Sequence, residues 1–219
     1  MSSRTLFRWS GIAVLLCGVL FLPAHLLKEI IGSGIMQYTH PLYVPTGLID
    51  SIRSLLLLLG LPGLYAYQAD RAGRLGLVSF VMTFLGLAAL EVGTIPMYTF
   101  IPPLLVAHPE TQALLTAESG LDTQLGPLFV AYAAPAMLAL NLGLILYGIA
   151  TLRARVFPRF AAACIIVGPI ALFTVAGLVP FGEPIALGVV MLGLVWCGLL
   201  LARAPIVFQV SAKPLASEA

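Results

Sequence analysis

The sequence predicts an all-α, polytopic membrane protein, a bundle of about six transmembrane helices with its N- and C-termini in the cytoplasm. Hydrophobic residues make up 60% of the chain and charged residues only 9%, whereas soluble domains carry about 25% charged residues. Six apolar segments, separated by turns and loops of different lengths, each approach the ~20 residues that a helix needs to cross a bilayer. The mean hydropathy of +1.06 agrees with lipid as the main solvent.

The first expected span, residues 9–27, follows two arginines and ends at a Lys-Glu pair. An apolar run behind basic residues resembles a signal peptide, but no small-residue cleavage site follows it, so we expect a retained helix. The second span, residues 44–67, carries Asp50 and Arg53 near its start. Because these two residues are three positions apart, their side chains lie on one face of a helix.

The third span, residues 75–95, carries Glu91 and follows the second after a short turn that contains two arginines. The fourth span, residues 126–152, contains no charged residue. The fifth and sixth spans, residues 160–179 and 184–202, are joined by a short turn rich in proline and glycine. Such a tight turn makes the last two helices antiparallel neighbours.

The outer loop, residues 96–125, is the least regular part of the pattern. Pro96, Pro102 and Pro103 disrupt a helical hydrogen-bond ladder, although the residues around them are apolar. This part of the chain could extend the third helix, lie at the membrane interface or form a re-entrant half-helix. Residues 111–118, which follow a Pro-Glu pair, are typical of a short surface helix.

The distribution of basic residues sets the expected orientation, because cytoplasmic loops are enriched in lysine and arginine. With six spans and an internal N-terminus, nine of the eleven basic residues fall inside: Arg4, Arg8, Arg71, Arg74, Arg153, Arg155, Arg159, Arg203 and Lys213. A seventh span through residues 93–107 would put the two arginine-rich turns on opposite faces. Six spans therefore fit the charges better, and residues 1–219 form one transmembrane helical domain.

Composition also limits partners and cofactors. The net charge of +2 and the lack of a basic run argue against nucleic acid, so the lipid bilayer is the expected partner, joined by other membrane protein chains if the protein is a subunit. The three histidines form no metal-binding pattern, and the three cysteines lie singly in apolar runs. We expect no metal site and no cofactor.

Four ionisable residues lie within the expected spans, where charge is costly and often functional. At ~1.5 Å per residue, all four fall in the same outer layer of the membrane: His25, Asp50, Arg53 and Glu91. They form a candidate intramembrane polar site in which the arginine could lie between the two carboxylates. Three residues are candidates for the rim of this site: Tyr98, Tyr132 and Glu183.

This polar layer has two structural explanations beside the functional one. The charges could form an ion-pair cluster that lets them survive in a low dielectric. Alternatively, Asp50 and Arg53 could extend to the lipid headgroups. The functional interpretation is a pocket that opens outward.

Three functions are compatible with these features. The first is a non-enzymatic subunit or accessory protein of a membrane assembly, because the chain has no soluble domain and few catalytic groups. The second is a small transporter or binding protein that uses the outward-facing polar pocket. The third, an intramembrane lipid-modifying enzyme, lacks a visible nucleophile-and-base pair, so we expect no enzyme. The inner turns are similar to those of prokaryotic membrane proteins, which makes a prokaryotic plasma membrane the expected location.

Overall fold

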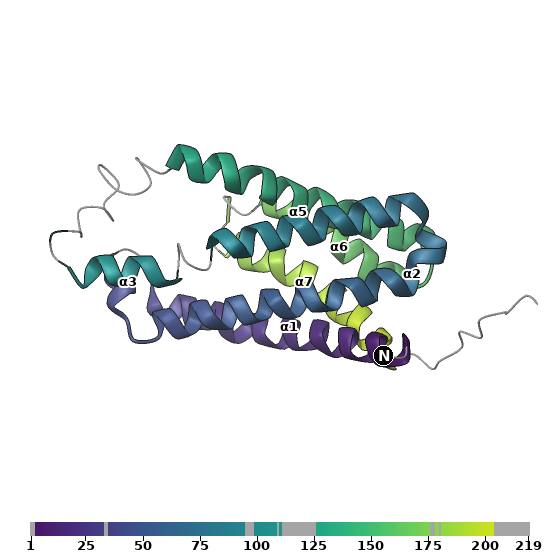
Figure 1. The fold of residues 1–219 in the computed structure, drawn as a ribbon, viewed down its shortest axis with the longest axis horizontal. Helices are drawn as coiled ribbons and strands as arrows, with labels where there is room; N and C mark the ends of the chain where they lie inside the picture. The colour runs from purple at the N-terminus through teal and green to yellow at the C-terminus, as the bar shows by residue number, and fades with distance from the viewer. Residues whose placement is uncertain are drawn as a thin grey trace, which may run out of the picture.

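The computed structural model describes residues 3–32, 35–94, 99–108, 110, 126–175, 178–179 and 181–203. The described residues form helices and contain no β-strand, which confirms the predicted all-α class. The elements, shown in Figure 1, are α1 (Ser3–Ile31), the 3-10 helix η1 (Ile35–Thr39), α2 (Tyr43–Thr94), α3 (Ile101–Val106), α5 (Gly126–Ala154), α6 (Arg159–Thr174) and α7 (Gly182–Arg203).

Four of these helices are long and apolar enough to cross a membrane, namely α1, α2, α5 and α7. The fifth apolar helix, α6, has 16 residues and so rises about 24 Å, less than the ~30 Å hydrocarbon core. Many large apolar side chains point outward from the bundle; Val92 and Leu178, for example, are 76% and 80% exposed. Such a surface suits lipid rather than water.

The long helix α2 consists of two helices joined at a kink. Its 52 residues are interrupted at Gly73, which has φ 59° and ψ −154°, a conformation that only glycine adopts easily. Figure 1 shows the chain turning back there, so that the two halves of α2 run side by side. The first half corresponds to the span expected at residues 44–67 and the second half to the span expected at residues 75–95. The residues between these spans, which were expected to form a turn, are helical except at Gly73.

The helices pack in a closed ring. Helix α2 packs against α1 and α5, α7 packs against α1 and α6, and α5 packs against α6. Their shared core includes the fully buried side chains of Val14, Leu61, Tyr147, Ile165 and Leu194.

One end of the bundle, here called the arginine end, holds the start of α1, the kink in α2, the turn between α5 and α6, and the end of α7 (Figure 1). Glycines bring the helices close together there. A Cβ atom on Gly11 would lie 2.6 Å from the backbone nitrogen of Ala202, and one on Gly63 would lie 2.2 Å from Cβ of Ser10. Close backbone contact through small residues is typical of helices packed in membranes.

The proline-rich part of the outer loop folds into α3, a helix of six residues that packs against η1. Six residues span about 9 Å, so α3 is too short to cross a membrane. Pro102 is buried in this short helix. The surface helix expected at residues 111–118 lies outside the described residues.

Candidate binding pocket at one end of the bundle

A pocket of about 780 Å³ opens at the end of the bundle opposite to the arginine end, here called the pocket end. Its volume falls within the range of roughly 300–1,000 Å³ that is usual for small-molecule sites. The walls come from the end of α1, η1, both ends of α2, Thr99, and the α5 and α7 residues nearest this end. The polar lining residues are Lys28, Gln37, Tyr38, Tyr43, Thr46, Asp50, Ser51, Arg53, Ser54, Glu91, Thr99 and Glu183.

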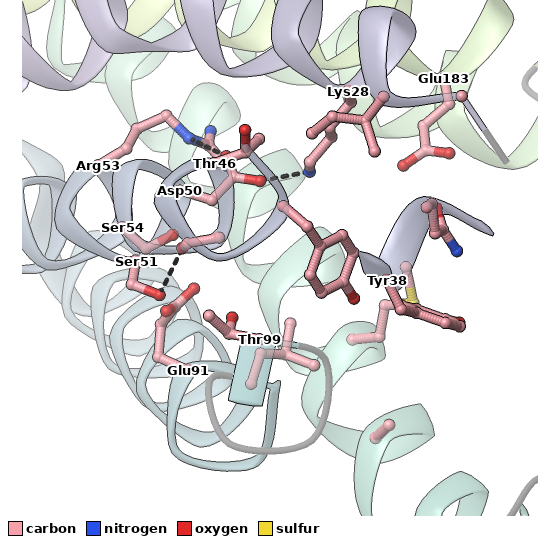
Figure 2. Close-up of a pocket in the computed structure, with 18 residues that line it drawn as sticks. Lys28, Tyr38, Thr46, Asp50, Ser51, Arg53, Ser54, Glu91, Thr99 and Glu183 are labelled. Atoms are coloured by element: carbon pink, nitrogen blue, oxygen red, sulfur yellow. Dashed lines mark hydrogen bonds and ion pairs between the residues drawn. The ribbon is translucent and has the colours of Figure 1, made fainter. Parts of the chain in front are cut away.

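Asp50 lies at the centre of the charges in this pocket. Arg53 is three residues further along α2, so helical geometry brings its Nε to 3.1 Å from Oδ1 of Asp50. The other carboxylate oxygen, Oδ2, forms an ion pair with Nζ of Lys28, which comes from the last turn of α1. In Figure 2, Asp50 therefore lies between its two basic partners. This cluster joins α1 to α2 with charges that are each satisfied.

Arg53 also has an aromatic neighbour on α1. Its guanidinium carbon lies 5.6 Å from the centre of the Phe21 ring, within the range of a cation–π contact. The Arg53 side chain is only 16% exposed. The guanidinium of Arg53 is thus held between the Asp50 carboxylate and the Phe21 ring.

His25 belongs to the same layer but is not a lining residue. Its Nδ1 lies 3.1 Å from the carbonyl oxygen of Phe21, a hydrogen bond that requires the proton on Nδ1. The His25 and Phe21 rings are 4.1 Å apart. Three of the four residues predicted for the polar site thus line the pocket, whereas His25 is linked to it through Phe21.

Glu91, near the end of α2, lines the pocket without an ion pair to any basic group among the described residues. The expected arrangement, with Arg53 between Asp50 and Glu91, is not found. The hydroxyl of Ser54 lies within hydrogen-bonding reach of the Glu91 carboxylate instead. Figure 2 shows Glu91 on the same side of the pocket as Ser51 and Ser54.

The three residues predicted for the rim have different positions. Glu183, in the first turn of α7, is exposed and lines the pocket. Tyr132 is not a lining residue; its hydroxyl donates a hydrogen bond to the carbonyl of Ala89, and its ring packs where a Cβ atom of Gly93 would lie. Tyr132 thus fastens α5 to the second half of α2. Tyr98 lies outside the described residues.

Several lining residues were not predicted as part of the site. Lys28 was expected only to end the first span. Thr46, Asp50 and Ser54 recur every four residues and so form a polar stripe along one face of α2. This spacing was visible in the sequence and could have identified the two hydroxyl residues.

The core of the bundle beyond the pocket is mainly apolar. Further along α2 from Ser54, Leu57, Leu61 and Leu64 are all buried within the main core cluster. Met191 and Leu194 of α7 belong to the same cluster. A few polar side chains are buried among the described residues as well, among them Gln68 and Thr83.

Among the described residues, no group of three or more His, Cys, Asp or Glu side chains is placed to hold a metal ion. The three cysteines, Cys17, Cys164 and Cys197, are buried free thiols. Within the described ranges, the chemistry of the site is thus that of paired charges, carboxylates, hydroxyls and tyrosine rings.

Comparison with protein-family models, with curated protein sequences and with solved structures finds no match to this chain.

Proposed function

We propose that the chain crosses a prokaryotic plasma membrane six times, with both termini in the cytoplasm. The kink at Gly73 divides α2 into two halves that are each about as long as a span, which with α1, α5 and α7 makes five spans. The sixth span is the shorter apolar helix α6. The orientation is supported by the grouping of exposed arginines at one end of the bundle: Arg8, Arg71, Arg74, Arg153, Arg155, Arg159 and Arg203. By the positive-inside rule, the arginine end faces the cytoplasm and the pocket end faces outward.

We further propose that the protein binds a small polar molecule in the pocket. The observation that carries this proposal is the pocket of about 780 Å³ within an otherwise apolar bundle, lined by three carboxylates and two basic groups. Placing five ionisable groups around one hollow is costly for a membrane protein unless they have partners. Asp50 forms ion pairs with Lys28 and Arg53. A bound molecule would provide a partner for the other two carboxylates, Glu91 and Glu183.

Binding fits the geometry better than an open channel. Leu57, Leu61 and Leu64, further along α2 than the pocket, are buried in the core cluster, so passage of a solute would require these core residues to separate. The hydroxyls of Thr46 and Ser51 donate to carbonyls of their own helix, whereas the Ser54 hydroxyl lies within reach of the Glu91 carboxylate. A serine and a carboxylate base therefore meet in this pocket, and the lipid-modifying enzyme stays an alternative prediction. The subunit hypothesis stays a prediction.

Cysteine labelling in intact cells tests both proposals. Ala133 lines the pocket, whereas its neighbour Ala134 is exposed on the outer surface of α5 and is not a lining residue. We expect a membrane-impermeant thiol reagent added outside to label Ala133→Cys, because water fills the pocket, and to spare Ala134→Cys, because lipid covers it. Arg155→Cys, at the arginine end, should react only after the membrane is permeabilised.

The native cysteines provide a low background, since Cys17 and Cys197 are 1% exposed and Cys164 is 7% exposed. Labelling of Arg155→Cys from outside would overturn the orientation. If Ala133→Cys and Ala134→Cys were labelled equally, or if neither were labelled, the pocket would not be filled with water from outside. Either result would overturn the binding proposal.

A further inference from the structure

We propose that the pocket recognises its ligand through a protonated amine that binds at Glu91. This inference rests on the proposed binding function and names the chemical class of the ligand. The amine could belong to a free solute or to an aminophospholipid headgroup, because both present the same N–H donors to the pocket.

The charges of the pocket favour a cation. Asp50 already holds both basic groups, Lys28 and Arg53, through its two carboxylate oxygens. Glu91 and Glu183 have no ion pair with any described residue, which leaves two carboxylates available to a ligand. The lining has three carboxylates and two basic groups, so its net charge attracts a cation, which can bind without breaking any existing pair.

The hydroxyl groups favour a hydrogen-bond donor. Oγ1 of Thr46 donates to the carbonyl of Leu42 at 2.7 Å, and Oγ of Ser51 donates to the carbonyl of Gly47 at 2.9 Å. A hydroxyl has only one hydrogen, so these two present lone pairs to the pocket. Together with the carboxylates they make a surface of acceptors, which suits an ammonium group that carries N–H bonds.

Two tyrosine rings add a surface for the cation. Tyr38 of η1 and Tyr43 at the start of α2 both line the pocket, and their rings meet edge to face with centroids 5.2 Å apart. Aromatic faces attract cations within about 6 Å. Figure 2 shows Tyr38 on the same side as Glu183 and away from Glu91. A cation entering past Glu183 would therefore meet an aromatic and acidic mouth before it reaches Glu91.

A matched set of small molecules tests this inference on the purified full chain in phosphatidylglycerol nanodiscs, whose headgroups contain no nitrogen. Ethanolamine, choline, glycolate and ethylene glycol share a two-carbon scaffold and differ in carrying a protonated amine, a quaternary amine, a carboxylate or no charge. We expect ethanolamine to bind most tightly by saturation-transfer NMR or calorimetry. Choline should bind more weakly because it has no N–H donor.

The variant Glu91→Gln should weaken ethanolamine binding by about tenfold or more, as expected for loss of a charged hydrogen-bond partner. Glu29→Gln is the matched control, because Glu29 is an exposed carboxylate in the last turn of α1, at the pocket end of the bundle, and does not line the pocket. It should leave binding unchanged. A thermal unfolding midpoint for each variant separates a folding defect from a loss of binding.

Nanodiscs that contain phosphatidylethanolamine distinguish the two sources of the amine. Retention of this lipid in native mass spectra, lost in Glu91→Gln, would identify the headgroup, whereas binding of ethanolamine alone would identify a solute; both results support the inference. If glycolate or ethylene glycol binds best and Ala133→Phe blocks it, the binding function stands and the amine inference is wrong. The same holds if Glu91→Gln binds ethanolamine as well as Glu29→Gln does. If no compound and no lipid binds, both proposals are overturned.

Discussion

The two ends of the bundle differ in how their helices meet. At the arginine end, Gly11 of α1 brings its backbone against Gly198 and Ala202 of α7. At the pocket end, the same helix α1 faces α2 through the long charged side chains of Lys28 and Asp50. The α1–α7 contact at one end is thus made through backbone and small residues, whereas the α1–α2 contact at the other is made through charged side chains.

This difference shows two ways in which helices of one bundle can be joined. Close contact at the arginine end joins α1 to α2 and to α7. At the other end, the ion pairs around Asp50 line a pocket of about 780 Å³. We therefore expect the glycine contacts to contribute mainly to stability and the charges to contribute to both stability and binding.

The largest effect should come from breaking the close contact at the arginine end. In Gly11→Ala, the new Cβ atom would lie 2.6 Å from the nitrogen of Ala202 and 2.7 Å from the oxygen of Gly198, so α1 and α7 must separate. We expect a loss of about 2–3 kcal/mol in the free energy of unfolding, measured by denaturation in detergent.

Gly188→Ala on α7 is the matched control, because its Cβ atom would lie 3.6 Å from the Phe21 ring, an ordinary contact. This variant should keep or raise stability, by up to about 1 kcal/mol from helix propensity. Equal losses in the two alanine variants would contradict the assigned role of the arginine end.

A smaller effect is expected from Asp50→Asn at the pocket end. The change removes the charge that pairs with Lys28 and Arg53, and the mostly buried Arg53 is left beside Phe21 without a carboxylate. We expect a loss of about 1–3 kcal/mol in unfolding free energy. Asp70→Asn, an exposed carboxylate at the arginine end, should change it by less than about 0.5 kcal/mol. Similar values for the two variants would mean that the Asp50 cluster is not structural.

The smallest effect is a difference in coupling within the pocket. A double-mutant cycle of Arg53→Gln with Asp50→Asn should give a coupling energy of about 1 kcal/mol, because the two side chains are in contact. A second cycle of Arg53→Gln with Glu91→Gln should be additive within about 0.5 kcal/mol, because they form no ion pair. Stronger coupling to Glu91 would favour the arrangement expected from the sequence.

Local features of this fold were predictable from the sequence. The apolar runs gave the all-α class, and the three-residue spacing of Asp50 and Arg53 gave their contact, because helical geometry fixes which side chains share a face. Counting residues along each helix placed His25, Asp50, Arg53 and Glu91 at a similar depth. Three of its four members line one pocket.

Contacts between helices were less predictable, because they depend on how each helix is rotated about its axis. Lys28 pairs with Asp50, whereas Glu91 faces Ser54 and has no basic partner among the described residues. Tyr132 bonds to Ala89 across two helices instead of lining the rim. A helix such as α5, which is apolar on all sides, has no polar face that would indicate which side is turned toward its neighbours.

The pocket is built from several elements of the chain: the end of α1, η1, both ends of α2, Thr99, and the α5 and α7 residues nearest this end. A molecule held there would tie these parts to one another, so binding and unfolding are thermodynamically linked. A ligand at a hundred times its dissociation constant would stabilise the native state by about 2.7 kcal/mol. Melting temperature is therefore a direct means of screening for the natural ligand, even for compounds of chemistry not yet considered.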